Sequence, residues 1–117
     1  MKVFVYGTLM AGQGNHSLLD NEFSEYIGPA ITKRGYTLYN LGSFPGVIEK
    51  GTSAVLGEIY EVCAFTLSRL DYLEGHPYFY KRKKVVLRDG STVQMYFLKE
   101  EDVVDCPVIK SGDWKNK

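Results

Sequence analysis

The first sixteen residues, MKVFVYGTLMAGQGNH, constrain the fold of this chain more than any other stretch. An unbroken apolar run at Val3–Val5 is typical of a central strand that is buried on both faces. The run ends at Tyr6-Gly7-Thr8-Leu9, where Gly7 can take backbone angles that other residues avoid. The stretch therefore predicts a buried strand that ends in a glycine-containing turn at the molecular surface.

Turns of this kind can aim successive backbone N–H groups into one concavity, which then holds an anion or a developing oxyanion. The same residues also suit an ordinary exit from a strand. The glycine spacing matches neither a phosphate-binding P-loop nor a dinucleotide-binding G-x-G-x-x-G motif. Further along, Asn15 is a candidate N-cap for a short helix over residues 16–22.

The first half of the remaining chain reads mainly as strands. Residues 25–33 predict a broken strand, because Gly28-Pro29 forces a bend or an edge position. An alternating strand follows over residues 36–41. Residues 42–46 predict a loop, in which Phe44 is either a core plug or a lid contact.

The second half adds a strand, a helix and a hairpin. Residues 54–62 predict a strand, in which Gly57 indicates a bulge or a close backbone approach. Thr66 then predicts the cap of a helix with an apolar stripe, and Gly75 its C-terminal stop. Asp89-Gly90 lies between two strand-like runs and predicts a hairpin with a type I′ turn. Hairpin connections dominate, so we expect one α+β domain over residues 1–117, with a small mixed, barrel-like sheet and flanking short helices.

Composition and charge argue against several classes of binding partner. The chain has 14 basic and 14 acidic side chains, so its formal net charge is zero. Nucleic-acid binders usually carry a basic excess, so we expect no nucleic-acid partner. No stretch approaches the roughly 20 apolar residues that a membrane span needs, so we also expect no membrane partner and a cytoplasmic protein. The two cysteines, Cys63 and Cys106, have no neighbours at metal-ligand spacing; we interpret them as buried thiols and expect no metal.

The stretch LDYLEGHPYFYKR, residues 70–82, contains the strongest candidate for acid–base chemistry. Glu74 falls in the last turn of the predicted helix, where the helix dipole disfavours a carboxylate. Burial under the aromatic residues that follow would raise its pKa further, and a general acid–base needs a pKa near neutrality. A solvent-exposed glutamate closing a surface helix remains the alternative. Asp71 and His76 are competing candidates, with a surface charge and a solvent-facing loop residue as their simpler interpretations.

Taken together, the motifs VYGTLMAGQGNH, GYTLYNLGSFPGV, GEIYEV, LDYLEGHPYFYKR and SGDW resemble the γ-glutamylcyclotransferase-like family. The resemblance extends from Val3 to Trp114 and is nearest to the γ-glutamylamine cyclotransferase branch. It implies a small mixed barrel, a substrate pocket formed by Tyr6, Gly7, Thr8 and Leu9, and a catalytic glutamate at Glu74. Tyr80 and Arg82 also match the family pattern. We expect Tyr80 to hydrogen-bond the carboxylate or the substrate, and Arg82 to pair with a structural acid.

The family reaction releases 5-oxoproline and a free amine or amino acid from a γ-glutamyl compound, without a cofactor. The resemblance therefore implies a small-molecule γ-glutamyl substrate, either a γ-glutamylamine or a short γ-glutamyl peptide. We expect a monomer or weak homodimer. The alternative is a catalytically silent module that binds a small molecule or a partner in the same pocket, because a fold alone does not decide activity.

Overall fold

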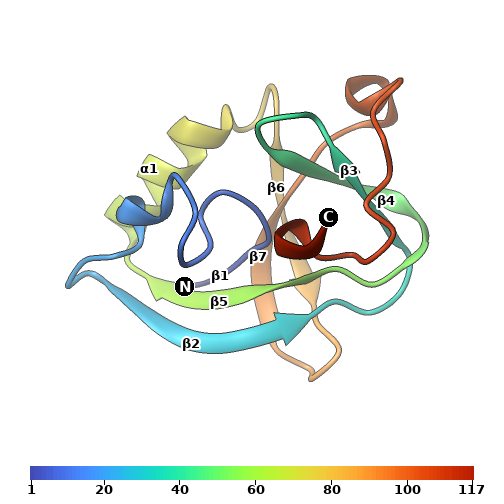
Figure 1. Cartoon of the computed structure of the whole chain (residues 1–117). Helices are drawn as coiled ribbons and strands as arrows, with labels where there is room; N and C mark the ends of the chain where they lie inside the picture. Colours follow the sequence, from blue (N-terminus) through green and yellow to red (C-terminus); the bar gives the residue numbers. More distant parts are fainter.

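The apolar run at the N-terminus forms β1 (Lys2–Val5), the middle strand of a five-stranded sheet with the order β2-β5-β1-β7-β6 (Figure 1). The computed structural model describes residues 1–117. β1 pairs antiparallel with β5 and parallel with β7. The other strands are β2 (Ser24–Ile31), β3 (Tyr36–Asn40), β4 (Pro45–Ser53), β5 (Leu56–Val62), β6 (Lys81–Val86) and β7 (Thr92–Phe97). The helices are α1 (Ala64–Glu74) and the 3₁₀ helices η1 (His16–Leu18), η2 (Glu100–Val103) and η3 (Trp114–Asn116).

The sheet curls until its two edge strands come close. The backbone N–H of Arg88, just after β6, donates to the carbonyl of Ile31 at the end of β2 (3.2 Å). β3 and β4 form a separate two-stranded sheet. The N–H of Leu98, the residue after β7, donates to the carbonyl of Val47 in β4 (2.9 Å) and so connects the two sheets. The expected α+β fold with a mixed, barrel-like sheet is therefore confirmed.

The core fills the inside of this curl. Val3 and Phe4 of β1 have no exposed surface, in agreement with a strand buried on both faces. Gly57 of β5 lies against β1, where an added Cβ would stand 2.4 Å from the carbonyl oxygen of Val5 and 2.6 Å from the ring of Phe4. Gly57 is thus explained by close approach, because any side chain there would push the two central strands apart.

Helix α1 differs from its prediction at one end. It begins at Ala64 rather than after Thr66, because Cys63 takes the extended N-cap conformation and Thr66 is buried inside the first turn. The predicted stop is confirmed, since Gly75 has φ +67° and its N–H donates to the carbonyls of Asp71 and Tyr72. The prediction of buried cysteines is wrong for Cys63, which is exposed at this cap, and Cys106 is half-buried.

Three other local predictions need correction. The helix expected over residues 16–22 is only the single turn η1, and Asn15 makes no capping hydrogen bond. β4 occupies a stretch for which no strand was predicted, because Pro45 and glycines obscure its pattern. The β6–β7 hairpin is confirmed, but Gly90 alone has positive φ and its N–H bonds to Leu87, so the turn is type I with a following left-handed glycine.

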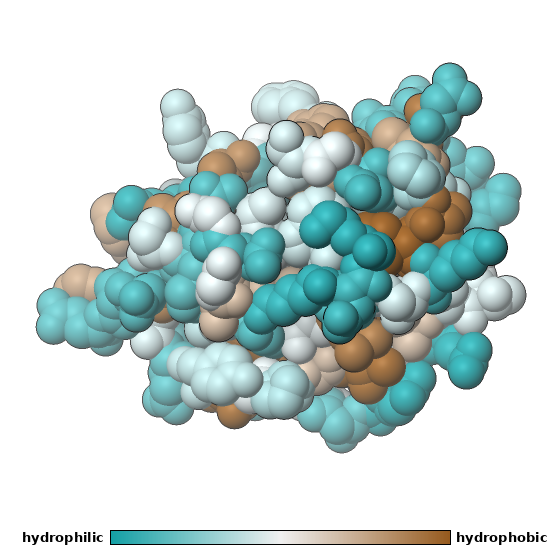
Figure 2. All heavy atoms as spheres, viewed as in Figure 1, coloured by the Kyte–Doolittle hydropathy of each residue, from teal (hydrophilic) through white to brown (hydrophobic).

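The edge position predicted from Gly28-Pro29 is confirmed, because β2 is an edge strand with a register shift between Tyr26 and Gly28. Hydrophilic residues cover most of the face seen in Figure 2, and hydrophobic ones show there in separate patches. α1, with 11 residues, is the longest helix, and none of the helices combines the length and apolar character of a membrane span.

Candidate active site

A cavity of about 190 Å³ opens where the end of β1, the end of α1 and the start of β4 meet. All six residues singled out from the sequence line it, although Glu74 is 65 or more positions from the Tyr6–Leu9 turn in the chain. The full lining consists of Phe4, Val5, Tyr6, Gly7, Thr8, Leu9, Asn15, Phe44, Pro45, Leu73, Glu74, Phe79, Tyr80 and Tyr96.

One wall of the cavity carries backbone donors that have no acceptor within the protein. The N–H groups of Gly7, Thr8 and Leu9 take part in no hydrogen bond, either to the backbone or to a side chain. The turn is nevertheless held in shape, because Asn15 binds Thr8 twice, through Nδ2 to Oγ1 (2.9 Å) and through its own N–H to the carbonyl (2.9 Å). These three groups form a wall of unsatisfied donors, which we call the donor wall.

The role of Gly7 differs from the one expected. Its φ is not positive, so no unusual backbone angle is needed there. A Cβ at Gly7 would instead lie 2.6 Å from Cγ of Pro45, the first residue of β4. Gly7 is therefore needed for space, because any larger residue would separate the donor wall from β4.

The loop after the donor wall is anchored by distant parts of the chain. The N–H of Ala11 donates to Oε1 of Glu58 in β5 (2.9 Å). Nε1 of Trp114, in the C-terminal tail, donates to Oε1 of Gln13 (3.1 Å). Trp114 is itself buried, so the tail packs back on the fold and holds this loop in place.

On the opposite side, Glu74 stands at the last position of α1 and contributes a carboxyl group without any hydrogen-bond partner. Burial raises the pKa of Glu74 to about 7. Of the aromatic residues expected to cover it, Phe79 and Tyr80 line the cavity, whereas Tyr78 is 89% exposed and points away. The carboxyl group can therefore gain or lose a proton near neutral pH.

Three buried tyrosines surround this carboxyl group. Tyr6 donates its hydroxyl hydrogen to the carbonyl of Tyr96 (2.7 Å), and Tyr80 donates to the carbonyl of Pro45. One of the two hydrogen bonds expected of Tyr80, the one to the Glu74 carboxylate, is therefore absent. Tyr96 donates to Oδ1 of Asp71 (2.7 Å). Burial and the nearby charge of Glu74 raise the pKa of all three hydroxyls, and Asp71 adds to the effect on Tyr96.

A network behind the cavity fixes the end of α1 to β6 and β7. Arg82 holds Asp71 with two hydrogen bonds, Nε to Oδ1 (2.8 Å) and Nη2 to Oδ2 (3.1 Å), and binds Gln94 of β7 through Nη1 (2.8 Å). Burial opposes ionisation of Asp71, but the hydrogen bonds from Arg82 and Tyr96 outweigh it and lower the pKa of Asp71. The expected pairing of Arg82 with a structural acid is confirmed.

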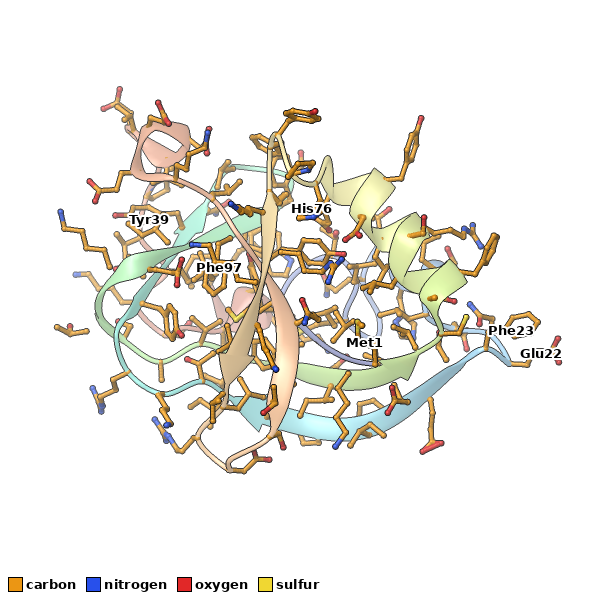
Figure 3. All side chains as sticks on the ribbon, turned by 180° about the vertical axis from the view of Figure 1, so that it is seen from behind. Met1, Glu22, Phe23, Tyr39, His76 and Phe97 are labelled. Carbon is orange, nitrogen blue, oxygen red and sulfur yellow. The ribbon has the colours of Figure 1, made fainter.

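The two competing acid–base candidates both lie outside the cavity lining. Asp71 belongs to the network above and is no free surface charge. His76 lies in the turn between α1 and β6 (Figure 3), and its Nδ1 accepts the backbone N–H of Arg82 (3.0 Å). Both residues therefore brace the helix end that carries Glu74.

Sequence reasoning missed several residues of the lining. Tyr96 belongs to no recognisable motif, since it is one of several apolar residues in β7. It reaches the cavity only because β7 pairs with β1. Asn15 was read as a helix cap, but its side chain supports Thr8. Phe44 is a half-buried wall of the cavity, packed edge-on against Phe79 and Tyr80, rather than a core plug. The structure contains no group of three or more His, Cys, Asp or Glu side chains arranged to hold a metal ion.

Known proteins resemble this chain over nearly its whole length. A model of the family described as gamma-glutamyl cyclotransferase, AIG2-like, matches residues 3–116. A Vibrio cholerae protein whose name proposes a gamma-glutamylcyclotransferase is 42% identical over 112 residues, which cover 96% of this chain and 93% of that protein.

Two solved structures share the fold. That of YtfP from Escherichia coli has a TM-score of 0.76 at 33% identity, and the match covers 100% of both chains. That of an AIG2-like protein from Mus musculus has a TM-score of 0.76 at 29% identity and covers 93% of this chain and 85% of the mouse chain. This chain therefore belongs to the AIG2-like gamma-glutamyl cyclotransferase family.

Proposed function

We propose that this protein is a cofactor-independent γ-glutamyl cyclotransferase, which converts a γ-glutamylamine or a short γ-glutamyl peptide into 5-oxoproline and a free amine or amino acid. The observation that carries the proposal is the pairing, in one small cavity, of a partnerless carboxyl group at Glu74 with three unsatisfied N–H groups at Gly7–Leu9. Family membership supports the reaction class.

The chemistry needs no protein nucleophile, because the α-amino group of the substrate attacks the substrate's own γ-carbonyl carbon. Ring closure is intramolecular, so much of the catalytic effect comes from holding a bent conformer ready for attack. A cavity of about 190 Å³ suits a compact, folded-back glutamyl unit rather than an extended peptide.

Glu74 acts as the general base and then as the general acid. The substrate amine is largely protonated at neutral pH, so its ammonium first gives a proton to the Glu74 carboxylate. The free amine then forms the new C–N bond to the γ-carbon. As the old C–N bond breaks, the Glu74 carboxylic acid returns the first proton to the departing nitrogen. The regenerated carboxylate then takes the second proton from the new ring nitrogen and passes it to the released amine, so the products are 5-oxoproline, with a neutral ring amide, and an ammonium ion. One group can do both because its pKa of about 7 matches the working pH.

The donor wall stabilises negative charge on the substrate. Its N–H groups bind either the developing oxyanion of the γ-carbonyl or the α-carboxylate. Their lack of internal acceptors means that a bound oxygen displaces only water. In other enzymes the loss of one such donor reduces turnover by roughly 100- to 1,000-fold.

The direct test is to incubate the protein with γ-glutamyl-ε-lysine and γ-glutamyl-alanine and to quantify 5-oxoproline by mass spectrometry. We expect the wild type to release 5-oxoproline from at least one substrate. The variant Glu74→Gln keeps the shape of the side chain but cannot exchange a proton, so its turnover should fall by at least about 100-fold. Glu101→Gln, an exposed glutamate in η2, is the matched control and should retain full turnover.

Two outcomes contradict the proposal. One is the absence of 5-oxoproline with both substrates, and the other is undiminished turnover in Glu74→Gln. Binding of 5-oxoproline without turnover of any substrate would identify the silent binding module instead.

A further inference from the structure

A second hollow adjoins the cavity on the surface of the molecule. It is an open groove between η1 and α1, which lie side by side in Figure 1. Its lining consists of Leu18, Phe65, Ser68, Arg69, Tyr72 and Leu73. Leu73 also lines the cavity, and so does Asn15, the residue just before η1. The same two segments therefore border both hollows, and the groove begins at the rim of the cavity, where Leu73 stands.

The groove is apolar apart from one cation. Phe65, Arg69 and Leu73 follow one another at intervals of one helical turn, so a single face of α1 presents them together. The aromatic side chains are open to solvent, since Phe65 is 70% and Tyr72 91% exposed. Large apolar side chains that gather at one exposed place are typical of a binding surface. No acidic side chain lines the groove.

The cation of the groove, the guanidinium of Arg69, has no partner within the protein. It takes part in no ion pair and in no side-chain hydrogen bond, whereas Arg82 is occupied by Asp71. A free guanidinium offers a planar fork of donors that matches a carboxylate. The groove is thus complementary to a ligand that combines an apolar side chain with a carboxylate.

The position of the groove relative to Glu74 indicates which part of a substrate reaches it. In the proposed reaction Glu74 protonates the departing nitrogen, so this nitrogen lies beside Glu74 and the neighbouring Leu73. The cavity suits the glutamyl unit alone, so whatever the nitrogen carries extends past Leu73. In an α-amino acid the carboxylate is attached to the carbon next to that nitrogen. Arg69 lies one turn from Leu73, with about 5–6 Å between Cβ atoms, so its long side chain can meet this carboxylate.

We propose that the groove between η1 and α1 binds the leaving amino acid of the substrate, with Arg69 on its α-carboxylate and Leu18 and Leu73 against its apolar side chain. The inference rests on the proposed function and names the substrate class within it. γ-Glutamyl peptides that end in an apolar amino acid are preferred to γ-glutamylamines whose amine carries no carboxylate. Amines with a further positive charge are disfavoured most, because they meet Arg69.

Isothermal titration calorimetry with a matched pair of ligands tests the groove. γ-Glutamyl-leucine and γ-glutamyl-isopentylamine differ only by the α-carboxylate. The titrations use the Glu74→Gln variant, in which turnover is suppressed, and the ratio of the two dissociation constants is the measured quantity. An exposed charge pair is a weak interaction, so we expect γ-glutamyl-leucine to bind about fivefold more tightly. This preference should shrink in about 0.5 M salt, because ions screen an exposed pair.

A second substitution in the same background tests the role of Arg69. Arg69→Met keeps an apolar stem and removes the charge, so the preference for γ-glutamyl-leucine should fall below about twofold. The affinity for γ-glutamyl-isopentylamine should stay within about twofold. Arg69→Lys keeps the charge without the planar fork and should give an intermediate preference. Arg34→Met, at an exposed arginine between β2 and β3, is the matched control and should leave the ratio unchanged.

The apolar half of the groove needs a different pair of ligands. γ-Glutamyl-glycine has the α-carboxylate but no side chain to place beside the half-buried Leu18. In Leu18→Ala we therefore expect the affinity for γ-glutamyl-leucine to fall about threefold, while the affinity for γ-glutamyl-glycine stays within about 1.5-fold. Equal weakening of both ligands would identify a purely structural role for Leu18 and remove it from the site.

The assignment is refuted if the Glu74→Gln variant binds the matched pair equally well or binds neither ligand. A preference for γ-glutamyl-leucine that survives Arg69→Met also overturns it, because the carboxylate is then bound elsewhere. The titrations require no catalysis, so the two proposals fail separately. A preference that depends on Arg69, in a protein that releases no 5-oxoproline, retains the groove and rejects the enzyme. Release of 5-oxoproline without such a preference does the reverse.

Discussion

The two walls of the cavity are built in opposite ways. The donor wall consists of backbone N–H groups, and Asn15 holds its turn by hydrogen bonds to Thr8. The loop that follows is held by two further hydrogen bonds, from Ala11 to Glu58 and from Trp114 to Gln13. The Glu74 carboxyl group makes no hydrogen bond at all, and only the helix that carries it is braced. The contrast has a chemical reason, because fixed dipoles stabilise charge best when they are rigid, whereas a group that transfers protons must stay free to change its charge.

The largest effect should come from breaking the brace on the acid side. In Asp71→Asn, Arg82 keeps its charge but loses its ionic partner, and Tyr96 loses a charged acceptor. Removing one partner of a largely buried ion pair is strongly destabilising. We expect the free energy of unfolding to fall by about 3 kcal/mol, measured by urea denaturation at pH 7.

The exposed pair Lys99–Glu101 provides the comparison. Glu101→Gln should change the free energy of unfolding by less than about 0.5 kcal/mol. A loss in Asp71→Asn as small as this would show that the helix end needs no brace from Arg82.

An intermediate effect is expected at Glu74 itself, and it depends on pH. Burial raises the pKa of Glu74 from its ordinary value to about 7, so the folded protein binds the proton more tightly than the unfolded chain. This contribution to stability is present below pH 4.5 and is lost as the pH rises through 7. Glu74→Gln should therefore be more stable than the wild type at pH 8.5, by no more than about 3 kcal/mol.

Thermal denaturation at pH 4.5 and pH 8.5 checks this expectation. The two proteins should differ at the higher pH and converge at the lower one. A Glu74→Gln variant with the wild-type melting temperature at pH 8.5 would mean that the carboxyl group is solvated, and it would remove the contrast between the two walls.

The smallest effect should come from loosening the donor side. Trp114→Phe removes the Nε1 donor to Gln13 and keeps most of the buried ring. We expect a loss of about 1 kcal/mol in the free energy of unfolding. Gln13→Ala should have a similar effect, and the double variant should lose less than the sum, which a double-mutant cycle in urea measures. Strict additivity would show that this contact does not hold the loop.

Much of the fold follows from local patterns. The apolar run at Val3–Val5, the Gly75 stop and the hairpin at Asp89-Gly90 all appear where the sequence predicts them. The local predictions that were wrong concern residues whose structure is determined by tertiary contacts. β4 begins at Pro45 and forms because β3 lies beside it, and Asn15 gives up capping to bind Thr8.

The sequence by itself determined the family, the central strand, the turn after it and the glutamate at the end of the helix, since these depend on motifs and on neighbours along the chain. Only the tertiary structure decided that Gly7 is needed for space beside Pro45, that Asp71 pairs with Arg82, and that Tyr96 joins the cavity. The pKa of Glu74 also depends on the fold, because desolvation comes from residues distant in sequence. Burial and the direction of a hydroxyl hydrogen are set by packing between strands, which no local pattern encodes.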